Sequence, residues 1–268
     1  MTDTLAAQPS PALASPSGPI APEDLDHYAR TGWLAARGLF SAAETADIAR
    51  WTEEVCAWPE VPGRHMVYYE KSLLDPAAKV VQRIENFCPY HPQFDALVRG
   101  GRLLAAVEQL LKRPAVLFKE KVNFKKAGGA GFEPHQDQQA GWSTYAPSFV
   151  TALVSIDRAT VENGCLEMSD APRYAGLIGQ EWTPLTPAEM ASFRLIPVET
   201  EPGDVLFFDS YAPHGSQPNL TGAQRRILYL TYNSAGYGDH RAQYYADKRR
   251  SFPPEVERES GKDYKFRV

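Results

Sequence analysis

Three residues have the types and spacing of a metal site. His135 and Asp137 lie two positions apart, and His214 follows far downstream. On an extended strand, residues i and i+2 point to the same side, so His135 and Asp137 can bind one ion together. Two imidazoles and one carboxylate match the facial triad of non-heme Fe(II) oxygenases, which leaves coordination positions open for other ligands. The pattern predicts an iron centre.

The sequence around His214 supports this interpretation. Residues 201–209 combine a tight Pro-Gly turn with a short apolar run that is typical of a strand, and His214 follows its far end. Arg225 opens a second apolar run, residues 225–232. A guanidinium at the start of a buried strand calls for an anionic partner. This context favours a metal site over a chance His-x-Asp pair.

Composition limits the classes of protein to consider. The chain has 268 residues and is 43% hydrophobic, which is sufficient for one large domain. Its net charge of −5 offers no basic field for nucleic acid or an anionic membrane, and no apolar stretch is long enough for a membrane span. The three cysteines lack metal-site spacing, and their odd number argues against a disulfide framework. We expect a cytoplasmic protein whose partner is a small molecule; the oligomeric state stays open.

The elements that must position these residues follow in a clear order. Residues 1–20 are rich in Ala, Pro and Ser and lack the basic start of a signal peptide, which predicts a disordered leader before a single domain over 21–268. Acidic residues begin a helix that ends at Gly32, and Ser41 with Glu44 forms a capping box for a second helix.

A third helix is predicted over residues 94–111, and strands are predicted over 116–124 and 149–156. Helices first and strands second indicate an α+β fold, with a β core flanked by N-terminal helices.

With these residues in view, the chain resembles the phytanoyl-CoA dioxygenase family of Fe(II)/2-oxoglutarate oxygenases. The matching stretches lie between about residues 116 and 232: His135-Gln136-Asp137, residues 162–167, residues 202–216 and Arg225. The resemblance implies a double-stranded β-helix, the jelly roll of cupin-like proteins. It also implies Fe(II) on the triad, with 2-oxoglutarate and O2 as cosubstrates.

The resemblance assigns roles to further residues. Arg225 would form a bidentate ion pair with the distal carboxylate of 2-oxoglutarate, a task for which lysine is a poor substitute. Asn123 resembles the strand asparagine that helps to hold the cosubstrate, although it could be an ordinary polar strand residue. Ser216 is assigned to the cosubstrate on the same basis. Asp137 favours hydroxylation, because halogenases of this superfamily carry Ala or Gly there. Residues 168–172 depart from the family's usual Pro-Gly-Ser-His, which we interpret as a loop variation.

Substrate residues are less strongly indicated. Trp142 is expected in a loop over the iron, where aromatic faces and acids recognise cationic nitrogen and basic groups recognise anions. The other candidates are aromatic, cationic or amide side chains: Tyr68, Tyr69, Tyr145, Arg83, Lys119, Lys121 and Asn86. A small zwitterion would fit this set. Burial in a core or exposure at the surface would explain the same residues.

Residues 66–70, 83–87 and 252–258 are similar to the bacterial 2-aminoethylphosphonate hydroxylase branch of the family. That similarity implies hydroxylation at the carbon next to phosphorus, in 2-aminoethylphosphonate or its N-trimethyl analogue. The alternatives are another small zwitterion or an acyl-CoA as substrate, a non-catalytic jelly roll that binds 2-oxoglutarate or metal, and a zinc hydrolase.

Two other features attract simpler interpretations. Lys248-Arg249-Arg250 is predicted to be a solvated charge run, and His27, His65, His91 and His240 are predicted to be surface or core histidines rather than a second metal site.

Overall fold

The computed structural model describes residues 18–264. The predicted leader lies outside the described residues as far as residue 17. Ile20 is only 3% exposed, packs in the main hydrophobic cluster and donates its backbone N–H to Gln109 Oε1 at 3.0 Å. Ile20 is therefore part of the packed core although it precedes α1 (Pro22–Thr31).

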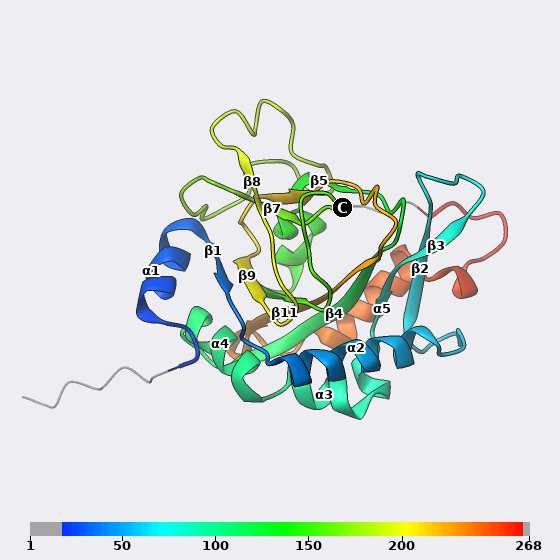
Figure 1. Cartoon of the computed structure of the whole chain (residues 1–268), viewed down its shortest axis with the longest axis horizontal. Helices are drawn as coiled ribbons and strands as arrows, with labels where there is room; N and C mark the ends of the chain where they lie inside the picture. The colour runs from blue at the N-terminus through cyan, green and yellow to red at the C-terminus, as the bar shows by residue number, and fades with distance from the viewer. Residues whose placement is uncertain (1–17, 265–268) are drawn as a thin grey trace, which may run out of the picture.

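Two antiparallel sheets form the centre of the molecule (Figure 1). The larger has the strand order β1-β9-β6-β11-β4-β3-β2, and the smaller has the order β5-β10-β7-β8. The strands are β1 (Trp33–Ala36), β2 (Met66–Lys71), β3 (Lys79–Glu85), β4 (Ala115–Lys125), β5 (Phe132–His135), β6 (Val150–Ser155), β7 (Leu166–Ser169), β8 (Leu195–Val198), β9 (Val205–Asp209), β10 (His214–Ser216) and β11 (Arg225–Ser234).

The two sheets pack against each other. One cluster of buried residues joins Leu166 and Met168 of the smaller sheet to Phe208, Ile227 and Tyr229 of the larger. This arrangement confirms the predicted jelly-roll core with mixed helix and sheet content.

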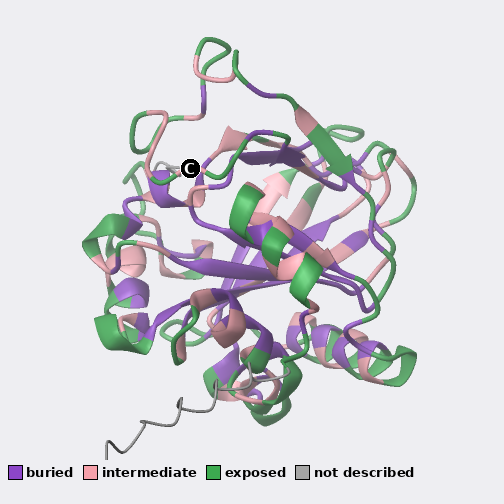
Figure 2. Ribbon diagram, turned by 90° about the vertical axis from the view of Figure 1, so that its left-hand side faces the viewer, coloured by how far each residue is buried: buried purple, intermediate pink, exposed green. Residues whose placement is uncertain are grey.

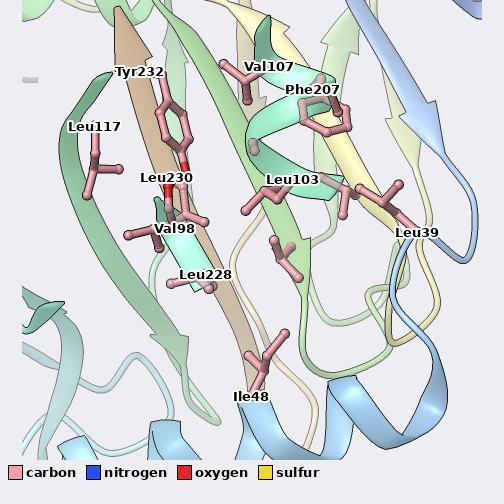
Figure 3. Packing of buried hydrophobic residues seen from close by; sticks show 14 of the residues in the cluster. Leu39, Ile48, Val98, Leu103, Val107, Leu117, Phe207, Leu228, Leu230 and Tyr232 are labelled. Atoms are coloured by element: carbon pink, nitrogen blue, oxygen red, sulfur yellow. Dashed lines mark hydrogen bonds between the residues drawn. The ribbon is translucent and has the colours of Figure 1, made fainter. Parts of the chain in front are cut away.

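Helices cover the outer face of the larger sheet: α2 (Ala42–Cys56), α3 (Pro92–Val98) and α4 (Gly101–Leu111) (Figure 1). Figure 3 shows Ile48 and Leu103 from these helices in the cluster with Leu228 and Leu230 of β11. Because side chains alternate along a strand, the intervening residues of β11 face the interior between the sheets. Buried residues therefore follow both faces of the central strands, while the helices expose their outer faces (Figure 2).

Local signals place most boundaries well. The capping box at Ser41 and Glu44 is present, and Gly32 ends α1 with a φ of 81°. The single helix predicted over 94–111 is wrong. Gly100 is extended between α3 and α4, because two adjacent glycines carry no side chains that would favour continuing the helix.

Within residues 18–264, no helix is both long and apolar enough to cross a membrane.

Candidate active site

The structure brings His135, Asp137 and His214 together, with one candidate ligand atom from each lying within 4.8 Å of the others. His135 and His214 are paired directly across β5 and β10, which brings their rings to a centroid distance of 4.4 Å. β5 ends at His135, and Asp137 begins a short 3-10 turn, residues 137–140. The predicted i, i+2 geometry survives because Gln136 keeps an extended backbone, with φ −105° and ψ 131°.

The second nitrogen of each imidazole is occupied by the backbone. His135 Nδ1 donates to the Glu133 carbonyl at 2.7 Å, and His214 Nδ1 donates to the Ala212 carbonyl at 2.9 Å. Each Nε2 therefore keeps its lone pair for a metal. Thr151 Oγ1 donates to Asp137 Oδ2 at 3.3 Å, which orients the third ligand. This donor set, two neutral imidazoles and one carboxylate, fits Fe(II).

The electrostatics of the triad keep its ligands unprotonated. Burial, together with the neighbouring His214, lowers the pKa of His135 to about 3. Burial also lowers the pKa of His214. Burial would raise the pKa of Asp137, but the nearby imidazole of His214 and the ammonium of Lys119 hold that pKa below its ordinary value. Protons therefore compete weakly with a metal at neutral pH.

Arg225 is the first residue of β11 and belongs to the face of the strand that points into the interior between the sheets. It is 1% exposed, and its Nε and Nη1 atoms have no hydrogen-bond partner among residues 18–264. A hydrogen bond connects its guanidinium to Tyr229, which also hydrogen-bonds Asn123. Asn123 Oδ1 is likewise buried without a partner. Unpaired buried donors of a guanidinium are costly, so they fit an absent carboxylate ligand such as the distal end of 2-oxoglutarate.

A second buried cation lies beside Arg225. Lys125 pairs with it across β4 and β11, and burial and the arginine lower the pKa of Lys125 to about 7. Its ammonium donates to Ser216 Oγ at 2.8 Å and to the carbonyls of Gly164 and Gln217. Ser216 accepts this bond, so its hydroxyl hydrogen stays available for a carboxylate.

A cavity of about 1010 Å³ opens beside the metal ligands. His135, Asp137, Trp142, Arg83 and Lys121 line it. This size lies at the upper end of the range for small-molecule sites. A second, small pocket shares His135 and Asp137 with this cavity and is also lined by Asn123, His214 and Tyr229.

Lys119 and Lys121 occupy successive inward positions of β4 in this cavity. Neither ammonium has a hydrogen-bond or ion-pair partner within residues 18–264. Lys119 Nζ lies 4.0 Å from the centre of the Trp142 ring, and Lys121 Nζ lies 4.8 Å from that of Tyr229. Burial is the main cause that lowers both pKa values, and each lysine is also affected by a neighbouring cation.

Behind these lysines, the buried carboxylate of Glu85 holds two other cations. Arg83 Nε donates to Glu85 Oε1 at 2.7 Å, and Lys248 Nζ donates to its two oxygens at 2.7 and 2.6 Å. The prediction that Lys248 belongs to a solvated charge run is wrong, since its side chain is 14% exposed and lines the cavity. Helical spacing brings it to the same face of α5 (Arg241–Ser251) as the buried Tyr244.

The predicted aromatic residues divide into two groups. Trp142 is 2% exposed and lines the cavity, with one ring face approached by Lys119, and Tyr145 lines it too. Tyr68 is outside the lining, because its hydroxyl donates to the Phe252 carbonyl and its ring stacks on Phe252. Tyr69 is also outside, with its hydroxyl bonded to Glu60.

Asn86 lies away from the cavity lining as well. Its Oδ1 accepts from Arg241 at 3.0 Å, and its backbone has a φ of 58°. The side chain of Asn86 therefore connects the end of β3 to the start of α5 instead of reaching the cavity.

Sequence reasoning missed several residues around the site. Lys125 and Tyr229 are inward positions of β4 and β11, and alternation from Asn123 and Arg225 was the available signal. Trp182 comes from the long loop between β7 and β8, which carried no local signal.

Comparisons with known proteins identify relatives over most of the chain. The sequence profile of the phytanoyl-CoA dioxygenase (PhyH) family matches residues 28–227. The chain is 39% identical over 243 residues to the 2-aminoethylphosphonate dioxygenase of an uncultured bacterium, HF130_AEPn_1, covering 90% of this chain and 92% of that protein. It is 38% identical over 229 residues to the methylphosphonate hydroxylase of Gimesia maris, covering 85% and 86%.

Solved structures share the fold. EctD from S. alaskensis, crystallised with 2-oxoglutarate and 5-hydroxyectoine, superposes with a TM-score of 0.71 at 21% identity, covering 84% of this chain and 79% of EctD. With the family profile spanning most of the chain and two relatives matched almost end to end, the chain belongs to the phytanoyl-CoA dioxygenase family.

Proposed function

We propose that this dioxygenase hydroxylates a small organophosphonate at the carbon next to phosphorus. 2-Aminoethylphosphonate and its N-trimethyl analogue are the leading candidates, and the reaction consumes 2-oxoglutarate and O2 at an Fe(II) centre. The names of the two phosphonate-active relatives support this proposal.

The unpaired ammonium groups of Lys119 and Lys121 are the observation that carries the proposal. Four cationic side chains line the inner cavity (Arg83, Lys119, Lys121 and Lys248), whereas Glu85 is the buried carboxylate that neutralises two of them. The remaining two lysines occupy successive inward positions of β4 and line the same cavity as Asp137. A dianionic phosphonate would offset this positive charge, and binding it would raise both lysine pKa values.

Two different sets of residues would bind the two anions of the reaction. Arg225, Lys125 and Ser216 would hold the distal carboxylate of 2-oxoglutarate, while Lys119 and Lys121 would hold the phosphonate. Since Lys121 and His135 line the same cavity, a phosphonate bound there would present its neighbouring carbon to the metal side. Bound Fe(II) with its cosubstrates supplies the oxidising chemistry, and the protein supplies position and shielding.

An acyl-CoA substrate has less support. The basic residues of the cavity are buried (Arg83 and Lys119) or half-buried (Lys121 and Lys248) rather than spread over a surface patch that could meet the CoA phosphates. With a net charge of −5, we also keep a small molecule, rather than nucleic acid or a membrane, as the expected partner, and the cytoplasm as the expected location.

The test is a panel of substrates offered to the iron-loaded enzyme under air. It includes 2-aminoethylphosphonate, its N-trimethyl analogue, methylphosphonate, an acyl-CoA and several amino acids. We expect substrate-dependent succinate and a product heavier by one oxygen atom from at least one phosphonate. His135→Ala is the matched control and should abolish both signals together with iron binding.

Other outcomes identify the alternatives. Hydroxylation of a CoA thioester without any response to a phosphonate would overturn the substrate assignment. Turnover without added iron or without O2 would instead support a hydrolase, and tight 2-oxoglutarate binding without turnover of any substrate would support a non-catalytic jelly roll.

A further inference from the structure

The long loop between β7 and β8, residues 170–194, reaches over the cavity next to the metal ligands. Part of this loop projects at the top of Figure 1. It carries a small hydrophobic cluster of its own, which includes Ala171, Leu185 and Phe193. The loop is therefore a packed element, and it contributes Trp182 and Pro184 to the lining of the cavity.

Trp182 has an unusual conformation. Its φ is 64°, a region that bulky residues rarely adopt, and its side chain is 44% exposed although it lines the cavity. The ring lies over Gly141, where an added Cβ would come within 2.2 Å of Trp182 Cζ2. A strained backbone of this kind persists where the surroundings over-determine it, often at ligand clamps.

Gln139 makes the hydrogen bonds that hold the backbone around Trp182. Its backbone carbonyl accepts from Trp182 N at 2.8 Å, and its Nε2 donates to the carbonyls of Gln180 and Thr183 at 2.7 Å each. These bonds hold the residues on both sides of the tryptophan. Gln139 is 0% exposed, and its Oε1 accepts from Gln136 N at 2.8 Å.

Gln136 reinforces the same connection. Its side chain donates to the Gly176 carbonyl at 3.0 Å and accepts from Ile178 N at 2.8 Å. Within one short segment, His135 and Asp137 face the metal position, while Gln136 and Gln139 hold the loop. The outer wall of the cavity is thus fixed to the metal-binding segment itself.

We infer that Trp182 is a specificity-determining residue, the aromatic outer wall that limits the size of the substrate, and that Gln139 is its positioning residue. This inference rests on the proposed function for the identity of the substrate. The wall lies at the entrance, as its partial exposure shows, whereas the lysine pair lies inside. A substrate that binds its phosphonate inside therefore directs its other end toward Trp182.

The experiment compares Trp182→Ala with the wild type, using 2-aminoethylphosphonate and its N-trimethyl analogue as probes. We expect the KM for 2-aminoethylphosphonate to rise by roughly tenfold, because an aromatic contact is lost. The kcat/KM ratio should shift toward the bulkier N-trimethyl analogue. The Kd of 2-oxoglutarate, measured by calorimetry without phosphonate, should stay unchanged. In Trp182→Phe, the KM for 2-aminoethylphosphonate should stay close to the wild-type value.

Gln139→Leu tests the positioning role. It should raise the KM for the phosphonate while Trp182 is still present, and the double variant should be no worse than Trp182→Ala alone, because both changes remove the same contact. Tyr237→Ala, which removes an exposed aromatic residue outside the cavity lining, is the control and should change nothing.

The failures of the two proposals are distinguishable. If the wild type turns over a phosphonate but Trp182→Ala keeps its KM and its preference between the two probes, the inference about the wall is wrong. If the wild type binds 2-oxoglutarate yet ignores every phosphonate, the proposed function is wrong, and the wall inference fails with it.

Discussion

Arg225 is a buried guanidinium with unused donors, and its substitution tests the cosubstrate site. Arg225→Lys keeps the charge but loses the planar fork, which typically removes about 1.5–3 kcal/mol of binding free energy. We expect the KM for 2-oxoglutarate to rise by roughly ten- to a hundredfold, with iron content unchanged. Arg226→Lys is a matched control, since that neighbour pairs with Asp157 outside the site and should leave the KM as it is. An unaltered KM in Arg225→Lys would move the anchoring role to Lys125, the second buried cation beside it.

Lys121 makes the reciprocal test of the phosphonate site. Lys121→Met removes one ammonium and keeps most of the side-chain volume. Loss of a charged contact should raise the KM for the phosphonate by roughly ten- to a hundredfold, while the Kd of 2-oxoglutarate measured without phosphonate changes little. Steady-state kinetics with either compound varied separate the two effects. A rise confined to the KM for 2-oxoglutarate would place Lys121 in the cosubstrate site instead.

At the scale of elements, β4 and α5 build the cavity together. The inner face of β4 carries the lysines, and its outer face carries Glu120, which is 0% exposed and receives two hydrogen bonds from Arg241 at the start of α5. Cys88 N also donates to Glu120, at 2.9 Å. This buried pair attaches the helix that lines the cavity to the strand that supplies its charge.

Breaking that pair should lower the stability of the protein. Glu120→Gln leaves Arg241 buried without its counter-charge, which should lower the free energy of unfolding by about 3–5 kcal/mol in urea denaturation. Asp95→Asn breaks an exposed pair with Arg99 and should cost less than about 1 kcal/mol. Equal small losses in the two variants would show that α5 is held by other contacts.

At the scale of the whole molecule, His65 links stability to pH. It is 3% exposed beside Trp58, and neither ring nitrogen has a hydrogen-bond partner among residues 18–264. Burial, with nearby Arg64 adding to it, lowers the pKa of His65 below its ordinary 6.5. The unfolded chain therefore binds a proton at a higher pH than the folded chain does, so stability present above 6.5 is lost as the pH falls below it.

We expect the midpoint of urea denaturation to move to lower urea concentration as the pH is lowered from 7.5 to 5.5. The contribution of His65 to the free energy of unfolding should be at most about 1.4 kcal/mol per pH unit. His65→Phe should flatten this dependence, because the phenyl ring fills a similar space and does not titrate. The same slope in the variant and the wild type would assign the pH dependence to other groups.

What the sequence determined by itself was local. The i, i+2 spacing of His135 and Asp137 survives the end of β5, because one extended residue is enough to keep both side chains on one side. The capping box of α2 and the run that opens at Arg225 are equally local signals. The resemblance to the family, which also rests on short motifs, predicted the jelly roll and the cosubstrates.

The tertiary structure decided which other side chains meet at the site. Lys248 joins Glu85 from 163 positions away, and Asn86 and Tyr68 are drawn to partners outside the cavity. Trp182 reaches the cavity only because Gln139 holds its loop there. These contacts depend on strand register and on how α5 and a long loop pack, and short-range residue spacing contains no information about either.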